Sequence, residues 1–519
     1  MNVTFESFVN EPCLDFSIPE NREALKAALE QVKGQLGREY PLIIGGERIF
    51  TEQKIVSINP GNLDEIVGYV SKADTKIVDR AMQVAWETFE TWKRVPPEER
   101  AQYLFKAADV LRRRRNEFSA WLIYEAGKNY TEADAEVAEA IDFMEYYGRS
   151  IIQISQDDHG LIRISDEDNH MTYIPLGVGA IIPPWNFPLA ICTGLTVSAV
   201  VAGNTVLLKP ASATPIIAYK FVEAMEEAGL PKGVINYIPG SGGEIGDYLS
   251  AHPKTRFISF TGSKDVGLRI NEIAGRTAEG QIWIKRVNAE MGGKDGVIVD
   301  ETADLEAAAN AIIESAFSFQ GQKCSAGSRA IIVESVYDEM VAKIVEKTKA
   351  LTVGDPKENH PVGPVIDKNA YEKILGYIEI GKKEAKLACG GGKAEGNGYY
   401  IQPTVFVDAD PKSRIMQEEI FGPVLAVCKA KDWKEAIDIF NNTEYGLTGS
   451  YFSNDEERIR YGIENIYCGN LYINRKCTGA LVGVHPFGGF NMSGTDSKSG
   501  GQDYLKLFMQ AKTYTRKLK

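Results

Sequence analysis

The sequence predicts an α/β protein with two parallel-sheet domains, and three observations support this class. Short apolar strands alternate with helical segments from residue 178 onward, the alternation begins again after a break near residues 291–295, and glycine turns follow two of the strands. Parallel strands need a long crossover connection, usually a helix, so the alternation indicates βαβ units. With 519 residues and 44% hydrophobic side chains, the chain can bury more than one core.

The composition excludes several classes of function. A net charge of −13 argues against general binding of nucleic acids or anionic membranes. The seven cysteines form no C-x-x-C pair and the five histidines do not cluster, so we expect no disulfide framework, no metal site and a reducing cytoplasm. The acidic N-terminus lacks the basic start of a signal peptide. Polar residues interrupt the most apolar stretch, 189–208, which is interpreted as a buried helix and strand rather than a membrane span.

The first part of the chain is predicted to be mainly helical. Apolar residues at helical spacing predict helices over 20–36 and 75–150. Residues 151–173 are expected to form extended segments around polar turns at 157–160 and 166–169. These segments lead into the alternating part of the chain.

The first alternating series contains five short strands, which are predicted at 178–182, 206–208, 234–238, 257–260 and 283–287. A helix begins at Thr214 and Pro215, because proline fits the first helical turn, and it ends at Gly229. Two further helices are predicted over 243–250 and 264–274.

The second alternating series contains four predicted strands and three predicted helices, in the order 296–299, 303–319, 330–333, 336–351, 369–384, 401–407 and 424–428. The break between the two series, near residues 291–295, divides the two predicted domains. Glu290 lies at this break, and Cys324 lies just inside the second domain. A site between domains is the usual place for an enzyme cleft.

Cys324 and Glu290 are the candidate catalytic pair. Cys324 lies in the small, polar run FQGQKCSAGSR (319–329), and Glu290 lies in AEMGGKD (289–295). A thiol nucleophile and a carboxylate base, each beside glycines, indicate covalent catalysis followed by hydrolysis. A lone cysteine is more often a small buried hydrophobe, and the other six are interpreted in that way. A free thiol is only partly ionised near neutral pH, so we expect the site to activate Cys324.

Two glycine turns and a lysine are candidates for binding a phosphate-containing cofactor. GSGGEIG (240–246) and FTGS (260–263) each follow a predicted strand and open a helix, where backbone N–H groups can bind a phosphate. Lys209 ends a strand at the carboxyl edge of the sheet, where it can hydrogen-bond a ribose. Each feature also has a plain interpretation, as a tight turn, a helix N-cap or a solvated lysine.

Two further motifs contribute an amide, a carboxylate and an aromatic ring. Three prolines in PPWNFPL (183–189) hold Asn186 in a stiff loop, where its amide can donate to a developing oxyanion. In EEIFGPV (418–424), a carboxylate can bind ribose hydroxyls and the phenylalanine ring can lie against a nicotinamide. The alternatives are a turn asparagine and a strand edge with a solvated glutamate.

Taken in order, these motifs resemble those of the NAD(P)-dependent aldehyde dehydrogenase superfamily. The resemblance covers nearly the whole chain and includes VLLKPA (206–211) and PFGG (486–489). It implies a homo-oligomer, a dimer or larger. It also implies three parts of the subunit, which are a dinucleotide-binding domain over 1–150 and 173–290, a catalytic domain over 291–495, and a small β oligomerisation element over 151–172 and 496–519.

The resemblance implies a role for each candidate residue. Cys324 attacks an aldehyde, Asn186 and the Cys324 N–H hold the oxyanion, and Glu290 activates the water that releases the acid. The cofactor is expected to be NAD, although Ser212 stands where many NAD-preferring relatives carry a glutamate, which leaves NADP open. The residues expected to bind the cofactor are Ile182, Pro184, Trp185, Lys209, Ser212, Gly242, Gly246, Phe260, Thr261, Gly262, Ser263, Met291, Gly292, Glu419 and Phe421.

Two C-terminal motifs narrow the resemblance to the bacterial 1-pyrroline-5-carboxylate dehydrogenases. They are NRKCTGA (474–480) and PFGGFNMSGTDS (486–497). The resemblance implies a small-molecule substrate, L-glutamate γ-semialdehyde, which is oxidised to L-glutamate in proline and arginine breakdown. A loop of small residues lets N–H groups approach the substrate carboxylate closely. The residues expected to bind the substrate are Phe187, Ser325, Gly479, Ala480 and Phe487.

Three alternatives stay open. Another semialdehyde dehydrogenase, for example one that acts on succinate semialdehyde, would use the same nucleophile and base. An acyl-phosphate reductase or a CoA-acylating enzyme of the same fold would not need the hydrolytic base Glu290. A catalytically silent structural or binding protein would not need Cys324, Glu290 and Asn186 together.

Overall fold

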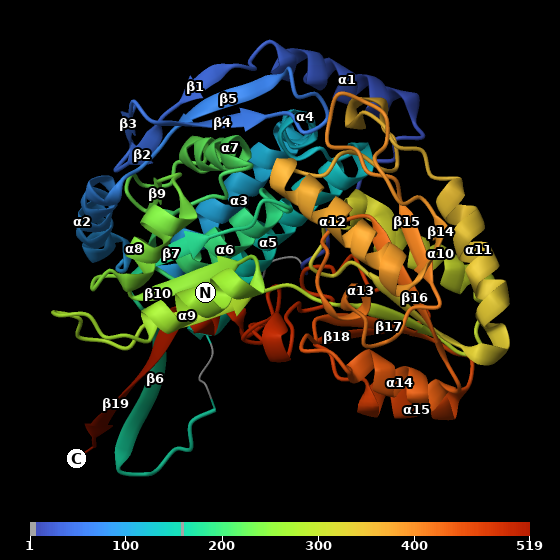
Figure 1. The fold of residues 1–519 in the computed structure, drawn as a ribbon. Coiled ribbons are helices and arrows are strands. Elements are labelled where there is room, and N and C mark those ends of the chain that lie inside the picture. Colours follow the sequence, from blue (N-terminus) through green and yellow to red (C-terminus); the bar gives the residue numbers. More distant parts are fainter. Residues whose placement is uncertain (1–6, 157–159, 519) are drawn as a thin grey trace.

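The protein folds into two seven-stranded sheets covered by helices, a three-stranded sheet and a two-stranded arm (Figure 1). The computed structural model describes residues 7–156 and 160–518. In Figure 1 the first large sheet and its helices, mainly cyan to green, lie beside the second, mainly yellow to red. Neighbouring strands at the centre of both sheets are parallel, which confirms the predicted α/β class.

The first large sheet has five parallel strands and two short antiparallel strands at one edge, in the order β11-β10-β7-β8-β9-β2-β3. Its strands are β2 (Leu42–Ile44), β3 (Glu47–Ile49), β7 (Val178–Ile182), β8 (Thr205–Leu208), β9 (Ile235–Tyr237), β10 (Phe257–Thr261) and β11 (Arg286–Glu290). The chain adds strands on one side of β7 and then crosses to the other side, so a switch point lies between β7 and β10. Open α/β sheets bind ligands at such a point, outside the carboxyl ends of the strands.

Nine helices of the described residues accompany this sheet. They are α1 (Pro19–Lys33), α2 (Thr75–Trp92), α3 (Pro97–Arg113), α4 (Arg115–Ala126), α5 (Tyr130–Gln156), α6 (Ala190–Val201), α7 (Pro215–Glu227), α8 (Asp247–Ala251) and α9 (Lys264–Ala274). Most of them build the largest apolar core, while α8, α9 and most of α2 pack in a second core. Helix α6 and strand β8 are almost wholly buried, which confirms the interpretation of residues 189–208 as core. Across the part of the chain that the structure describes, no helix combines the length and apolarity needed to cross a bilayer.

Five short strands precede β7, and the sequence analysis predicted none of them. β1 (Arg38–Tyr40), β4 (Lys54–Ile58) and β5 (Ile66–Ser71) form a three-stranded sheet in the order β1-β5-β4, while β2 and β3 join the first large sheet. Three of the five are only three residues long. A strand of that length carries too little alternation of apolar and polar side chains to be recognised before its partner strand is known.

The second large sheet has the order β14-β15-β16-β13-β12-β17-β18, and only β14 runs antiparallel to its neighbour. Its strands are β12 (Gly296–Val299), β13 (Arg329–Val333), β14 (Lys386–Cys389), β15 (Thr404–Val407), β16 (Val424–Ala430), β17 (Thr448–Phe452) and β18 (Asn470–Ile473). Its helices are α10 (Leu305–Phe317), α11 (Tyr337–Lys349), α12 (Lys368–Glu384), α13 (Arg414–Gln417), α14 (Trp433–Asn441) and α15 (Glu456–Asn465). The segment 291–295 connects β11 to β12, and the ranges of the domains stay a prediction.

One predicted strand is displaced by three residues. The sequence indicated a strand at 283–287, whereas β11 spans Arg286–Glu290. Ile282 and Ile284 are 86% and 88% exposed, and Trp283 stacks on a tryptophan of α2, so this apolar stretch is a surface loop. The displacement places Glu290 at the carboxyl end of an edge strand, beside the segments that follow the neighbouring strands.

The arm joins two segments that are far apart in the chain. β6 (Glu167–Pro175) pairs antiparallel with β19 (Met509–Lys517), and the pair projects from the body of the molecule (Figure 1). The predicted extended structure is confirmed for β6 but wrong for residues 151–156, which continue α5 because their isoleucines pack into the core at helical spacing. The turn predicted at 157–160 includes residues 157–159, which lie outside the described residues.

Candidate active site

The candidate catalytic residues lie on segments that connect to the strands of both large sheets. Asn186 follows β7 in the first sheet, and its Nδ2 donates to the carbonyl of Gln322 at 3.0 Å, two residues before Cys324. Glu290 ends β11, and its negative charge contributes to raising the pKa of the Cys324 thiol. The structure therefore brings all three residues into one region, although they belong to different elements. Their roles there stay a prediction.

The backbone before Cys324 makes a left-handed turn. Phe319, Gln320 and Gly321 have φ angles of 47°, 57° and 67°, a region that residues other than glycine rarely occupy. The side chain of Gln320 holds the turn, because its Nε2 donates to the carbonyls of Gly127 at 3.3 Å and Pro364 at 2.9 Å. Such strained turns persist only where the surroundings fix them, and they are concentrated at active sites.

Cys324 differs from most other cysteines in its exposure. It is partly exposed, whereas four of the others are buried as predicted. The prediction is wrong for Cys389, which is partly exposed, and for Cys13, which is exposed because the N-terminal segment runs along the surface.

The charges around Cys324 do not favour its thiolate. Burial raises the pKa of the Cys324 thiol above its usual range, and the carboxylates of Asp295, Glu290 and Glu419 raise it further. The expectation that the site activates this thiol is therefore wrong as far as the protein's own side chains are concerned. The charged groups near the sulfur are carboxylates rather than cations, and they disfavour the thiolate. These surroundings favour the thiol over the thiolate, so a nucleophilic role for Cys324 requires that its proton pass to water as the sulfur reacts.

Glu290 is suited to act as a base toward water. Burial raises its pKa to about 7, although hydrogen bonds from Ser497 lower it. The hydroxyl and the N–H of Ser497 both donate to Oε1, whereas Oε2 accepts no hydrogen bond from the described residues. A general base is most effective when its pKa lies near the working pH, so Glu290 can exchange a proton near neutrality.

An open backbone turn and a buried lysine occupy the expected cofactor side. A Cβ on Gly242 or Gly243 would meet no atom within 4 Å, so this turn faces open space. The Nζ of Lys209 is buried and donates to the carbonyl of Pro210 at 3.2 Å, and burial lowers its pKa to about 8. A ligand with hydroxyl and phosphate oxygens fits this pair of features.

The second sheet contributes a carboxylate and a ring to the same side. The N–H of Gly293 donates to Glu419 at 3.1 Å, and a side chain on Gly292 would overlap this carboxylate. The ring of Phe421 packs edge-on against Trp185, with 5.4 Å between their centroids. These contacts join segments from both sheets around the expected cofactor position.

The other expected cofactor residues fall into two groups. One group lies in or beside the segments that follow strands of the first sheet, and it contains Pro184, Ser212, Gly246, Thr261, Gly262 and Ser263. The other group is buried in the apolar core, where its side chains pack against one another, and it contains Ile182, Phe260 and Met291. Only the first group presents polar groups at the carboxyl edge of the sheet.

A small-residue loop lies beside the segment that follows the nucleophile. The thiol of Cys477 donates to the carbonyl of Ser325 at 3.4 Å, which holds residues 478–480, including Ala480, near Ser325. Gly479 has a φ angle of 76°, in the region that favours glycine. Its carbonyl accepts a hydrogen bond of 2.6 Å from Arg475, which fixes the loop from its outer side.

Two phenylalanines expected to line the substrate path approach the site from different segments. The ring centroid of Phe187 lies 6.3 Å from that of Phe319, so Phe187 borders the turn before Cys324. Phe487 is half-buried, and its backbone pairs with Ser499 through two hydrogen bonds of 2.7 and 2.8 Å. Their contact with a substrate stays a prediction.

Sequence reasoning missed several charged or polar groups of the site. Burial raises the pKa of Asp295 to about 8 and lowers that of Lys294 to about 7. Both residues lie in the AEMGGKD motif that contains Glu290, so their place in the sequence could have marked them as site residues. Ser497 gave no comparable signal, because it reaches Glu290 from 207 residues further along the chain.

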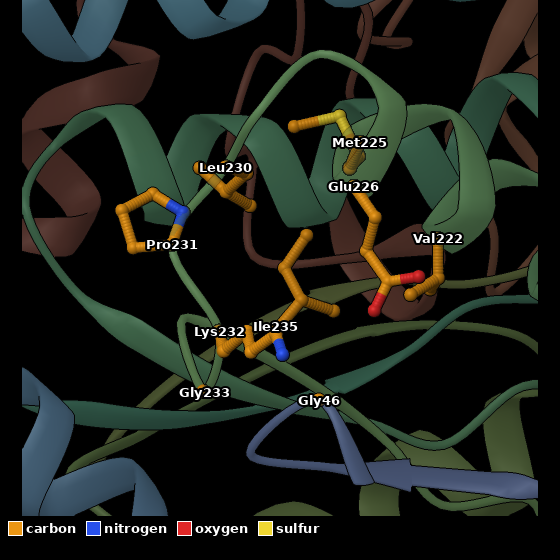
Figure 2. Close-up of a pocket in the computed structure, with 9 residues that line it drawn as sticks. All are labelled: Gly46, Val222, Met225, Glu226, Leu230, Pro231, Lys232, Gly233 and Ile235. Atoms are coloured by element: carbon orange, nitrogen blue, oxygen red, sulfur yellow. The ribbon is translucent and has the colours of Figure 1, made fainter. Parts of the chain in front are cut away.

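Figure 2 shows a small pocket that is separate from this site. It lies between the end of α7 and β9, where Lys232 lies close to Gly46, and it contains none of the expected site residues. Within residues 7–156 and 160–518, no group of three or more His, Cys, Asp and Glu side chains is arranged to hold a metal ion.

Known proteins match this chain over almost its full length. The aldehyde dehydrogenase family matches residues 50–514. Proteins named 1-pyrroline-5-carboxylate dehydrogenase from Geobacillus kaustophilus (strain HTA426) and Bacillus cytotoxicus are 61% and 58% identical to it, over 98% and 99% of this chain and 99% of each relative. A crystal structure of 1-pyrroline-5-carboxylate dehydrogenase from Thermus with bound NAD is 49% identical, with a TM-score of 0.98 over 99% of this chain and 100% of that one. The predicted resemblance is confirmed, and the chain belongs to the aldehyde dehydrogenase family.

Proposed function

We propose that this protein is a NAD-dependent 1-pyrroline-5-carboxylate dehydrogenase, which oxidises L-glutamate γ-semialdehyde to L-glutamate. The observation that carries the proposal is the meeting of Cys324, Glu290 and the Asn186 loop next to the small-residue loop at 478–480. Full-length similarity to dehydrogenases of this name supports the same substrate and cofactor.

The chain's own groups account for the covalent part of the reaction. The sulfur of Cys324 forms a bond to the aldehyde carbon as the thiol proton passes to water, while the Asn186 amide and the Cys324 N–H stabilise the oxyanion. The chemistry that bound NAD supplies is acceptance of the hydride. The adduct on Cys324 becomes a thioester, and Glu290 takes a proton from the water that replaces the sulfur and releases the acid.

NAD fits the residues on the cofactor side. Lys209 and Glu419 would hold ribose hydroxyls, the open turn at Gly242 would accept the pyrophosphate, and Phe421 would lie near the nicotinamide. Ser212 is exposed and uncharged, so no carboxylate at this position repels the 2′-phosphate of NADP. NADP therefore belongs in the same assay as NAD.

Several properties of the whole molecule belong to the proposal. The two large sheets support the division into a dinucleotide-binding domain and a catalytic domain at the predicted ranges. The projecting pair of β6 and β19 supports its predicted use in subunit pairing. All seven cysteines, each within the described residues, are free thiols, which supports a reducing cytoplasm.

An absorbance assay for NADH tests the substrate and the cofactor together. We expect kcat/KM for pyrroline-5-carboxylate to exceed that for succinate semialdehyde by roughly 10-fold or more, because succinate semialdehyde places its carboxylate one carbon closer to the aldehyde. Running NAD and NADP side by side ranks the cofactors. A preference for succinate semialdehyde would overturn the substrate, and oxidation of no aldehyde would favour a silent binding protein.

Ser497→Ala is expected to move the pH dependence of turnover upward. Loss of the hydroxyl removes a hydrogen bond that lowers the pKa of Glu290, so the carboxylate ionises at higher pH and the rising limb of kcat shifts up by about one unit or less. Steady-state rates across the pH range measure the shift. Ser198→Ala, which removes a buried hydroxyl within α6, is the control, and a shift in the opposite direction would contradict the assignment.

A further inference from the structure

We propose that Lys128 is a positioning residue that holds together the two halves of the oxyanion site, an inference that rests on the proposed function. Lys128 lies between α4 and α5, close in sequence to neither Asn186 nor Cys324. Its side chain is completely buried, with 0% exposure. A fully buried lysine is rare in proteins and needs strong partners, so its surroundings define its role.

One atom of Lys128 contacts both loops of the oxyanion site. Its Nζ lies 4.0 Å from the ring centre of Phe187 and 3.8 Å from that of Phe319. Phe187 directly follows Asn186, and Phe319 begins the left-handed turn that leads to Cys324. The faces of aromatic rings attract cations, most strongly away from water. The ammonium group therefore draws the two loops toward the same point.

Glu136 completes the arrangement on the Asn186 side. Its Oε2 lies 3.0 Å from the Nζ of Lys128, and both side chains have no exposure. Its Oε1 accepts hydrogen bonds from the N–H groups of Leu189 at 2.7 Å and Ala190 at 3.1 Å. The pair of Lys128 and Glu136 thus fixes the end of the loop that carries Asn186. Burial of two charges is tolerated because each has a partner.

The residue before Lys128 contacts the other half of the site. The carbonyl of Gly127 accepts a hydrogen bond from the side chain of Gln320, inside the left-handed turn. The segment 127–128 therefore supports both the ring and the amide side chain of that turn. Lys128 touches none of the reacting atoms, so its effect is on the distance and angle between the Asn186 amide and the Cys324 N–H. Misplacement of such donors by a fraction of an ångström is costly for catalysis.

Variants of Lys128 can show whether this residue positions the oxyanion donors or only stabilises the fold. K128M removes the charge, and the double variant K128M/E136Q also removes the carboxylate that K128M leaves unpaired, which protects folding. We expect cleavage of p-nitrophenyl acetate without cofactor, and the NADH burst with aldehyde, to fall by roughly 10- to 10²-fold in both variants. Alkylation of Cys324 by iodoacetamide should change by less than about 3-fold, because this reaction forms no oxyanion.

Lys220 provides a matched control in α7. It is almost wholly buried, lies 5.3 to 5.8 Å from three aromatic ring centres and pairs with Glu223 at 2.9 Å, but it contacts neither loop. K220M should lower the melting temperature as K128M does and leave all three rates unchanged. Equal rates in K128M and K220M, or equal losses of ester cleavage and alkylation in K128M, would overturn the proposal. Ester cleavage and alkylation need no semialdehyde, so a wrong natural substrate would leave this test intact.

Discussion

Cys324→Ala is expected to abolish aldehyde oxidation, with kcat lowered by roughly 10⁴-fold or more. The substitution removes the thiol that follows the left-handed turn and lies near Glu290, so no bond to the aldehyde carbon forms. Four of the other thiols are buried and cannot replace it. NADH formation measures the loss, and titration with NADH should show that cofactor binding is retained.

Cys192→Ala is the control for this variant. Cys192 is buried in α6, where its removal leaves a small cavity but touches no residue of the site. We expect nearly normal turnover and a slightly lower melting temperature. Normal turnover of Cys324→Ala would show that another group is the nucleophile. Loss of turnover in both variants would show that the effect is structural.

The sequence predicted some strands and missed others, which include β14, β17 and β18 of the second large sheet. Strands such as β7 and β12 are buried on both faces, so they appear as continuous apolar runs between turns. The short strands β1 and β3 have no such run, and β1 is defined by its pairing with β5. The loop at 282–284 shows the opposite error, because exposed isoleucines imitate a buried strand.

The site residues were likewise predictable from local sequence motifs, whereas the electrostatic surroundings that distant segments create were not. Cys324, Glu290 and Asn186 lie in runs of small or rigid residues that are unusual for a core, so the sequence alone indicates them. The pKa of the Cys324 thiol is raised first by burial and then by carboxylates that other segments bring near the sulfur. No local pattern encodes that charge, which explains why activation was predicted and the reverse was found.

Glu290→Gln is expected to produce one rapid burst of NADH, followed by turnover slowed by roughly 10²- to 10⁴-fold. An amide keeps the shape of the side chain and can still accept a hydrogen bond from Ser497, but it cannot take a proton from water. Acyl transfer to Cys324 should therefore proceed while hydrolysis of the thioester stops. Rapid-mixing absorbance measures the burst, and intact mass should show the acyl group on the protein. Hydroxylamine, a nucleophile that needs no base, should release it.

Glu125→Gln is the matched control, because burial also raises the pKa of Glu125 to about 7. Glu125 accepts hydrogen bonds from Ser57 and from the N–H groups of Ile216 and Ile217 at the start of α7. In Glu125→Gln an NH₂ group faces a backbone N–H donor, so the free energy of unfolding should fall by about 1 to 3 kcal/mol. Steady turnover should be unchanged. Continued turnover of Glu290→Gln would remove Glu290 from the mechanism. Glu290 and Glu125 are both buried and have similar pKa values, but only Glu290 lies near Cys324. If thioester hydrolysis stops in Glu290→Gln and not in Glu125→Gln, the position of Glu290 identifies it as the base.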